Sequence, residues 1–361
     1  MRKIKKSIIT KSIKDFKIDR SIKKTYIPKL GDVAVFQILS IGKHKAVQSE
    51  KGNNSYIFPG DKILATFGTR YASNQFEGYL PKKYHTKYQL LGQGGVVGVL
   101  ESMHAKFKYI GATEVRLVGY AVDEKGNVLN TIYNNYKPIS FKPFKKRTYE
   151  IYLSVGASMD SGKTTTAAFL SRGLMKQKKK VAFIKLTGTV YAKDCSFVRD
   201  CGARMAIDFS YCGYPSTFLC KTNDILTILE TLLSRVEQIN PDAVVIEIAD
   251  GLLQKETKAL INHKPFMEII DHTILSCADS LSVNSGVEIL SKVGNTPTLI
   301  TGLFTASPLM INEVKENTSI PVFDLEDFMN KEIFNSVFSP KVKSNRINEV
   351  KPKQQFNSTI S

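Results

Sequence analysis

Two patterns of hydrophobic and polar positions follow one another along the chain. In the first, short apolar runs are separated by glycine, proline and asparagine, as in residues 33–39, 62–67, 96–100 and 114–122. Runs of this length with turn residues between them are typical of a small β-barrel or sandwich. The sequence therefore predicts a β-rich domain over residues 29–135.

The second pattern alternates apolar runs with segments of helical periodicity. The apolar runs are 151–155, 181–186, 244–248, 272–275 and 298–301, and the clearest helical segments are 163–178 and 224–239. Strand and helix in alternation predict a parallel sheet covered on both faces. We expect an α/β domain over residues 149–330, joined to the β-rich domain by a basic, proline-bearing linker at 136–148.

The strongest chemical signal is the segment SVGASMDSGKTTT, residues 154–166, which follows a predicted strand and opens a predicted helix. From Ala157 it reads A-x-x-x-x-G-K-T, a Walker A loop with alanine in the place of the first glycine. Such a loop binds phosphate through successive backbone N–H groups and the positive end of the helix. Lys163 is expected to reach the β- and γ-phosphates, and the Thr164 hydroxyl to bind Mg²⁺. The residues that we expect to contact the nucleotide are Gly156, Ala157, Ser158, Met159, Asp160, Ser161, Gly162, Lys163, Thr164 and Thr165.

A second element is the apolar run of residues 241–251, which ends in two carboxylates and a glycine. A strand beside the phosphate-binding loop commonly supplies an acidic residue for Mg²⁺. Because burying an unpartnered carboxylate is costly, Glu247 is predicted to be functional, as a catalytic residue and a metal ligand. Asp250 is a second candidate for Mg²⁺, although it could simply begin a turn with Gly251.

Residues 184–194 leave the next predicted strand at the same edge of the sheet. We expect Lys185 to neutralise charge during phosphate transfer and Asp194 to help hold Mg²⁺. The alternative for Lys185 is that its stem extends to the surface. Two polar segments farther on, 199–203 and 208–217, are predicted to form loops on the substrate side.

Together these residues resemble the dethiobiotin-synthetase-like branch of P-loop proteins, which includes uncharacterised relatives with an extra N-terminal domain. The resemblance covers roughly residues 149–328. Lys-Leu-Thr-Gly-Thr at 185–189 is similar to the strand-end segment of that family, and Asp194 and Glu247 stand where it has acidic residues. The family's Glu-Gly-x-Gly-Gly is replaced by Glu-Ile-Ala-Asp-Gly at 247–251, so synthesis of a biotin precursor is not expected. The resemblance implies Mg-ATP rather than Mg-GTP, and attack on the γ-phosphate by a carboxylate, amine or hydroxyl. It also implies that residues 301–309 contact the base or the substrate.

Charge is concentrated at the two ends of the chain. The net charge is +18, of which residues 1–30 supply +9 and the residues from Pro340 onward supply +4. We expect a basic N-terminal arm over 1–28 and a basic C-terminal tail over 331–361. Either arm could touch RNA, an acidic protein or anionic lipid, or simply be solvated.

The remaining composition excludes several classes of protein. The five cysteines contain no C-x-x-C pair, so neither a disulfide framework nor a zinc site is indicated. No apolar run approaches the roughly 20 residues that span a bilayer. The N-terminal segment lacks the apolar stretch of a secretory signal, and we therefore expect a cytoplasmic protein.

Two functions fit these observations. The first is an ATP-dependent enzyme of the kinase or ligase type, in which Lys163, Lys185 and Glu247 act on a small molecule held under the β-rich domain. The second is a nucleotide-switched binding protein, whose β-rich domain and basic arms bind RNA or a protein. Nucleotide hydrolysis would return such a protein to its starting conformation. A homodimer is a further expectation, because several relatives build active sites across dimers.

Overall fold

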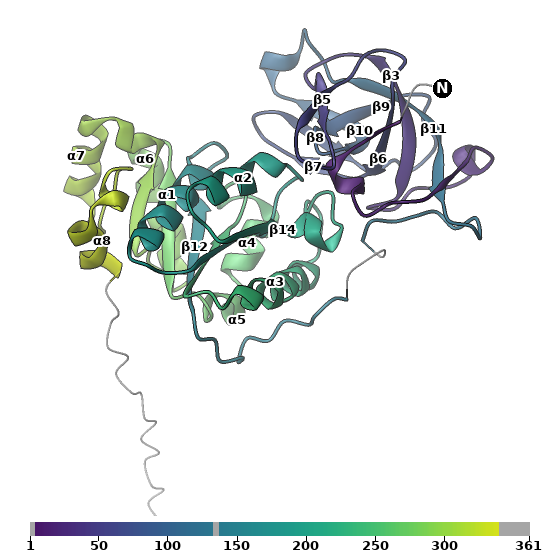
Figure 1. Ribbon diagram of the computed structural model, residues 1–361. Helices are drawn as coiled ribbons and strands as arrows, with labels where there is room; N and C mark the ends of the chain where they lie inside the picture. Colours follow the sequence, from purple (N-terminus) through teal and green to yellow (C-terminus); the bar gives the residue numbers. More distant parts are fainter. Residues whose placement is uncertain (1–3, 133–136, 339–361) are drawn as a thin grey trace, which may run out of the picture.

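The computed structural model describes residues 4–132 and 137–338 of the chain, and two large sheets organise it (Figure 1). A nine-stranded sheet belongs to the N-terminal part and a six-stranded sheet to the C-terminal part. Among the described residues, no helix has the combined length and apolarity needed to cross a bilayer.

The N-terminal sheet closes on itself. Its strands are β1 (Lys5–Lys6), β2 (Lys17–Asp19), β3 (Val33–Ser40), β6 (Lys62–Phe67), β7 (Arg70–Tyr71), β8 (Phe76–Tyr79), β9 (Tyr88–Gly92), β10 (Val96–Met103) and β11 (Glu114–Val122), and β4 (Ala46–Gln48) and β5 (Asn54–Tyr56) form a separate hairpin. The order β6-β3-β11-β9-β10 returns to β6 through a parallel pairing of β10 with β6. The β-rich domain is therefore a closed barrel rather than a sandwich. Four aromatic rings, those of Phe36, Phe67, Tyr88 and Tyr120, meet in its core.

Residues 5–19 do not form the flexible arm that their charge suggested. Strand β1 pairs with β6 and β2 pairs with β11, so this segment is part of the sheet. The side chains of Ile9 and Ile13 are 4% and 1% exposed. Burial of these isoleucines offsets the cost of ordering a basic segment, whose lysines extend to the surface. At the other end, residues 331–338 form helix α8 (Lys331–Phe338), and the remainder of the predicted C-terminal tail lies outside the described residues.

The C-terminal sheet is fully parallel, with the strand order β14-β13-β15-β12-β16-β17. Its strands are β12 (Glu150–Gly156), β13 (Val181–Lys185), β14 (Met205–Asp208), β15 (Ala243–Glu247), β16 (His272–Cys277) and β17 (Leu299–Gly302). The helices between and after them are α1 (Lys163–Lys176), α2 (Ala192–Asp200), α3 (Thr222–Val236), α4 (Lys255–Ile261), α5 (Lys264–Met267), α6 (Ser280–Lys292) and α7 (Pro308–Asn317). The prediction of an α/β domain with a parallel sheet is confirmed.

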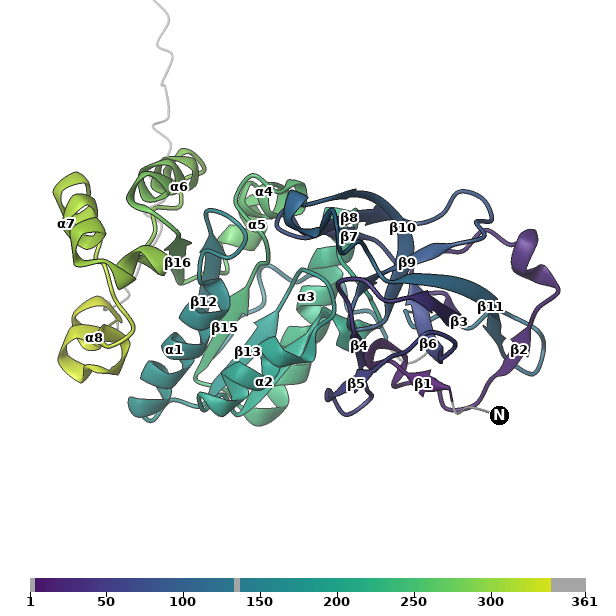
Figure 2. The same cartoon turned by 90° about the horizontal axis from the view of Figure 1, so that it is seen from above.

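Helices cover both faces of this sheet because every strand is apolar on both sides. Along β12, Leu153 faces a core shared with α3, α4 and α6, whereas the neighbouring Tyr152 faces a core shared with α1, α2 and α8. Figure 2 shows α1 and α2 on one side of the sheet and α4 and α6 on the other. Strand β12 is central, so the loop that follows it emerges from the middle of the carboxyl edge.

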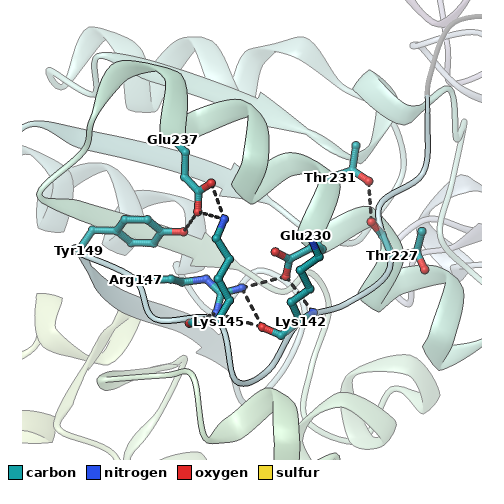
Figure 3. Close-up of polar contacts among 8 residues, drawn as sticks. All are labelled: Lys142, Lys145, Arg147, Tyr149, Thr227, Glu230, Thr231 and Glu237. Carbon is teal, nitrogen blue, oxygen red and sulfur yellow. Dashed lines mark hydrogen bonds and ion pairs between the residues drawn. The ribbon is translucent and has the colours of Figure 1, made fainter.

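The predicted linker is packed against α3 and the short turn that follows it, as Figure 3 shows. Backbone N–H of Lys142 and Nη2 of Arg147 both donate to Oε2 of Glu230, at 3.2 and 2.8 Å. Lys145 Nζ lies 2.6 Å from Oε2 of Glu237. The Arg147 and Glu230 side chains are 6% and 1% exposed, so this ion pair is buried. The segment between the two domains is thus held in place by buried charge.

The barrel and the α/β domain share part of one apolar core. Ile9, Leu91 and Val96 from the barrel join the same cluster as Val190 and Phe209 from the α/β domain. A polar contact accompanies this packing: the backbone N–H of Ala192 donates to Gln48 Oε1 at 2.9 Å. The barrel is therefore packed beside the carboxyl edge of the parallel sheet.

Replacement of Arg147 by alanine should destabilise the folded chain strongly. The substitution leaves the buried Glu230 carboxylate without its cation, and we expect the free energy of unfolding in urea to fall by about 3 kcal/mol. The matched control is Lys145→Ala, which breaks the more exposed ion pair with Glu237 and should cost about 1 kcal/mol or less. Equal losses for the two variants would contradict the larger contribution that we expect from the buried pair of Arg147 and Glu230.

Candidate functional site

The loop between β12 and α1 has the geometry of a phosphate-binding loop. Gly162 has φ of 100°, a left-handed conformation that side chains disfavour, and α1 begins immediately after it. A Cβ atom at Gly156 would lie 2.3 Å from Ser161 Oγ and 2.7 Å from Lys163 Cγ, so only glycine fits there. Both glycines are needed for the loop to curl over the start of the helix.

Most of the backbone N–H groups of this loop are free to bind a ligand. Among the hydrogen bonds of the described residues, none is donated by the backbone N–H groups of residues 158–163. The exception at the start of the loop is Ala157, whose N–H donates to the Ser276 carbonyl at 2.9 Å. Ala157 therefore anchors the loop to β16. We expected its N–H to bind phosphate, and in the structure that N–H is already bonded.

Lys163 lies across this loop, with its side chain largely buried. Its Nζ donates to the Ser158 carbonyl at 2.6 Å and to Ser161 Oγ at 3.4 Å. Burial lowers the pKa of Lys163, and the nearby carboxylates of Glu247 and Asp250 counteract part of that effect. The ammonium group is thus placed among the unbonded N–H groups of the loop, where an anion would meet both.

Four predicted residues from four elements meet beside the loop. The register of the parallel strands puts Lys185 at the end of β13 next to Glu247 at the end of β15. Lys185 Nζ lies 3.3 Å from Glu247 Oε1 and forms a second ion pair with Asp194, in the first turn of α2. The Thr164 hydroxyl, at the start of α1, donates to Glu247 Oε1 at 3.2 Å. The structure therefore brings Thr164, Lys185, Asp194 and Glu247 into one cluster.

Lys185 is a buried cation and not a surface lysine. The residue is only 8% exposed, so its stem does not extend to the surface. Burial by itself would lower the pKa of Lys185, but the carboxylates of Glu247 and Asp194 outweigh burial and raise it. The ammonium group consequently stays charged at neutral pH and holds the two carboxylates in place.

The cluster also fits a bound Mg²⁺ ion. Glu247 Oε2 is buried and has no hydrogen-bond partner among the described residues, which leaves one carboxylate oxygen for a ligand. In the part of the chain that the structure describes, no group of three His, Cys, Asp or Glu side chains could hold a metal ion by itself. Mg²⁺ at this site would need phosphate oxygens and water as further ligands, which is its usual environment in nucleotide sites.

Asp250 lies on the turn after β15 that packs against the phosphate-binding loop. Its φ is 65°, and the following Gly251 is so close to the loop that a Cβ there would lie 2.6 Å from the Ala157 carbonyl oxygen. Burial raises the pKa of Asp250 to about 6, although Lys163, Lys185 and Arg70 act in the opposite direction. Asp250 thus both begins a turn and faces the charged cluster.

Two cavities flank the loop. The first, of about 310 Å³, lies beside the start of α1 and will be called the α1 cavity; it is lined by Gly162, Thr165, Thr166, Gly302, Leu303, Thr305, Ala306, Asp324, Leu325 and Glu326. The second, of about 370 Å³, lies between the two domains and will be called the interdomain cavity. Lys185, Asp194 and Asp250 line the interdomain cavity from the α/β domain, and Lys43, Arg70 and Gln75 line it from the barrel.

Sequence reasoning missed the barrel residues of this site. Asn74 Nδ2 donates to Asp160 Oδ2 at 2.6 Å, so the barrel contacts the phosphate-binding loop directly. Arg70 and Lys43 lie in short strands and turns without a recognisable motif, and no local signal marks them. Only the packing of the barrel against the carboxyl edge of the sheet brings them to the loop.

One predicted loop is not at the site. Residues 199–203 end α2 and lead into β14, so they lie at the amino edge of the sheet, away from the phosphate-binding loop. The expectation was wrong because helix α2, which the sequence pattern did not reveal, carries the chain back across the sheet. Residues 208–217 do follow the carboxyl end of β14, and there the Gly213 carbonyl accepts a hydrogen bond from Thr131 Oγ1 of the barrel at 2.6 Å.

The fold and the loop together define the class of this domain. A central parallel strand, an A-x-x-x-x-G-K-T loop with unbonded N–H groups and a helix that starts at the lysine are the features of a P-loop NTPase domain.

Comparison with known proteins adds structural neighbours of low similarity. No protein-family model matches the sequence, and no curated protein matches it. Among solved structures, the chain is similar to the signal recognition particle receptor FtsY from Elizabethkingia anophelis in complex with GDP, with 16% identity and a TM-score of 0.36 over 55% of this chain and 66% of that chain. It is also similar to the signal recognition particle 54 kDa protein from Aeropyrum pernix K1 in complex with GDP, with 19% identity and a TM-score of 0.34 over 51% of this chain and 44% of that chain. In both cases the match spans less than two thirds of the solved chain, and similarity at this level does not bear on function.

Asp250 should make stability depend on pH in the metal-free protein. Its folded pKa of about 6 lies above the ordinary value of 3.8, so the folded state increasingly loses stability as the pH rises from about 4 to about 6, and the loss is constant above that range. Asp250→Asn removes this cost, and asparagine tolerates the left-handed backbone. We expect the variant to be more stable than the wild type by on the order of 1–2 kcal/mol at pH 7.5 and equally stable at about pH 4.

Urea unfolding in the presence of EDTA at both pH values measures this difference. The exposed Asp200, replaced by asparagine, serves as the matched control. An advantage of Asp250→Asn that is the same at both pH values would contradict the raised pKa.

Proposed function

We propose that this protein is a Mg²⁺-dependent nucleoside triphosphatase of the kinase or ligase type, which transfers the γ-phosphoryl group of ATP to a small molecule. The observation that carries the proposal is the loop of unbonded N–H groups at residues 158–163, with the Lys163 ammonium among them. Such an arrangement is built for a polyphosphate chain, because each oxygen can accept from a fixed donor at little reorganisation cost.

The residues of the cluster would divide the work of phosphoryl transfer. Lys163 would bind the β- and γ-phosphates, and Lys185 would stabilise the charge that develops on the transferred group. Thr164 and Glu247 would hold Mg²⁺, with Asp194 and Asp250 holding its water shell. When bound, Mg²⁺ neutralises phosphate charge and orients the triphosphate.

The α1 cavity is our proposed site for the nucleoside. It adjoins Thr165, directly after the phosphate-binding residues, and Gly302, Leu303 and Thr305 line its opposite side. These three residues lie in segment 301–309, which the resemblance to dethiobiotin-synthetase-like proteins associates with base or substrate contacts. The preference for ATP over GTP rests on that resemblance.

A small-molecule acceptor is favoured over an RNA or protein partner by the position of the barrel. The barrel packs beside the loop and encloses a cavity of about 370 Å³ at the charged cluster, which is the size of a small-ligand site. Moreover, residues 5–19 are part of the barrel sheet and are not an arm that reaches for a partner.

Lys163→Ala should abolish most nucleotide binding while the chain stays folded. Loss of the charged hydrogen bonds to phosphate is expected to weaken Mg-ATP binding by about 10- to 100-fold, as measured by isothermal titration calorimetry. The matched control is Lys176→Ala, at the exposed end of the same helix, which should bind as the wild type does. Titrations with GTP, and with ATP in EDTA, establish the base preference and the dependence on Mg²⁺.

Unchanged Mg-ATP affinity in Lys163→Ala would contradict the proposed loop. Turnover separates the two kinds of function: we expect ADP release that requires a small molecule, which becomes phosphorylated or ligated. Slow hydrolysis that is stimulated by RNA or by a protein, with no modified small molecule, would instead establish a nucleotide-switched binding protein.

A further inference from the structure

The interdomain cavity has one wall of cationic side chains that the proposed phosphate chemistry does not use. Lys43 and Arg70 of the barrel form this wall, and Lys185, Asp194 and Asp250 face them from the α/β domain. Lys185 and Asp194 are already paired with one another. The two barrel cations are different, because among the described residues neither has a carboxylate within salt-bridge distance.

Arg70 is held in place by neutral acceptors. Its Nη1 donates to the Leu91 carbonyl and its Nη2 to Gln75 Oε1, both at 2.7 Å. Its Nε is buried and has no hydrogen-bond partner among the described residues. Burial lowers the pKa of Arg70 to about 10, which still leaves the guanidinium charged at neutral pH. A half-buried, oriented guanidinium with no carboxylate at salt-bridge distance among the described residues is a strong attractor for an anion, even though Asp250 acts on it from farther away.

Lys43 adds a second positive charge beside Arg70. Its Nζ donates to the same Gln75 Oε1, so the amide oxygen of Gln75 holds both cations together. The ammonium also lies 5.4 and 4.9 Å from the ring centres of Phe76 and Phe107. An ammonium has three N–H donors, and the contact with Gln75 occupies one. Burial, with smaller contributions from Arg70 and Lys106, lowers the pKa of Lys43 to about 8, so the group is mostly charged at pH 7.

The neighbouring groups define the charge and size of the anion. His44 contributes no charge, because burial lowers its pKa to about 3, even though the contact of its Nε2 with the Leu91 carbonyl oxygen at 3.2 Å acts in the opposite direction. The opposite wall carries the carboxylates of Asp194 and Asp250, which repel a dianion more strongly than a monoanion. A volume of about 370 Å³ admits a small metabolite but not a polymer.

We propose that the interdomain cavity is the acceptor site of this enzyme and that Arg70 and Lys43 bind a carboxylate of a small-molecule substrate. The inference rests on the proposed phosphotransfer function and names its substrate class. The carboxylate would sit on the barrel wall, so that the rest of the molecule extends toward the cluster of Lys185, Asp194 and Glu247. The barrel would then be a specificity domain for an enzyme whose phosphate chemistry lies entirely in the α/β domain.

Calorimetric titration of the full chain with small carboxylates tests this proposal. The protein is first saturated with ADP and Mg²⁺, so that the α- and β-phosphate positions of the loop are filled and the probe anions cannot bind there. The monocarboxylates acetate, propionate and butyrate are then compared with the corresponding neutral amides and with inorganic phosphate. We expect at least one monocarboxylate to bind and its amide not to bind.

The variants assign the binding to the barrel wall. Arg70→Gln and Lys43→Gln should each weaken carboxylate binding by about tenfold or more, because each substitution removes a charged hydrogen-bond donor and leaves a neutral side chain of similar size. The matched controls are Arg116→Gln and Lys45→Gln, two exposed cations of the same barrel, which should leave the affinity unchanged. All four variants should bind ADP as the wild type does.

Several outcomes would overturn the proposal. These are no carboxylate binding, carboxylate binding that is unchanged in both Arg70→Gln and Lys43→Gln, and inorganic phosphate that binds more tightly than any carboxylate and is weakened by Arg70→Gln and Lys43→Gln. Weaker binding of ATP, but not of ADP, to Arg70→Gln would indicate that the Arg70 guanidinium contacts the γ-phosphate. That result would also overturn the proposal. Failure of the wild type to bind ADP in the first titration contradicts the proposed function alone, and the carboxylates are then titrated without nucleotide.

Discussion

The buried ion pairs of Lys185 with Glu247 and Asp194 are the interaction on which the rest of the site depends. Two adjacent parallel strands end in register at a cation and an anion, and the first turn of α2 adds the second carboxylate. A buried charge of either sign is tolerated only with such partners. Because Thr164 also donates to Glu247, the start of α1 is tied to the same cluster. The loop, the strands and the helix are therefore fixed relative to one another by charge as well as by packing.

Around this cluster, the phosphate-binding loop separates two cavities with different walls. The α1 cavity is enclosed by the α/β domain alone, whereas the barrel contributes one side of the interdomain cavity. This asymmetry underlies our proposal that the nucleoside binds on one side of the loop and the acceptor on the other. In our proposal the barrel recognises the substrate, because Lys43 and Arg70 line the interdomain cavity and neither has a carboxylate at salt-bridge distance among the described residues. The docked linker and the shared apolar core hold that wall in position.

Much of the fold could be predicted from local patterns. Apolar runs predicted five of the six parallel strands, and the motif at 157–164 predicted both the loop and the start of α1 at Lys163. The short strand β14 and helix α2 were not predicted, because their apolar positions are few and interrupted by polar residues. The N-terminal segment was misjudged for the opposite reason: its high charge concealed isoleucines that are buried in the barrel.

The sequence by itself determined the phosphate-binding loop and the residue types of the charged cluster, because glycines, a lysine and strand-end carboxylates carry their chemistry in local spacing. It could not decide whether Lys185 is buried or exposed, because that depends on which strands become neighbours in the sheet. Nor could it bring Arg70 and Lys43 to the cluster, since more than 80 residues separate Arg70 from the loop's lysine and no motif links them. Their meeting is decided only by the packing of the barrel against the carboxyl edge of the sheet, which buries apolar side chains of both domains in one core.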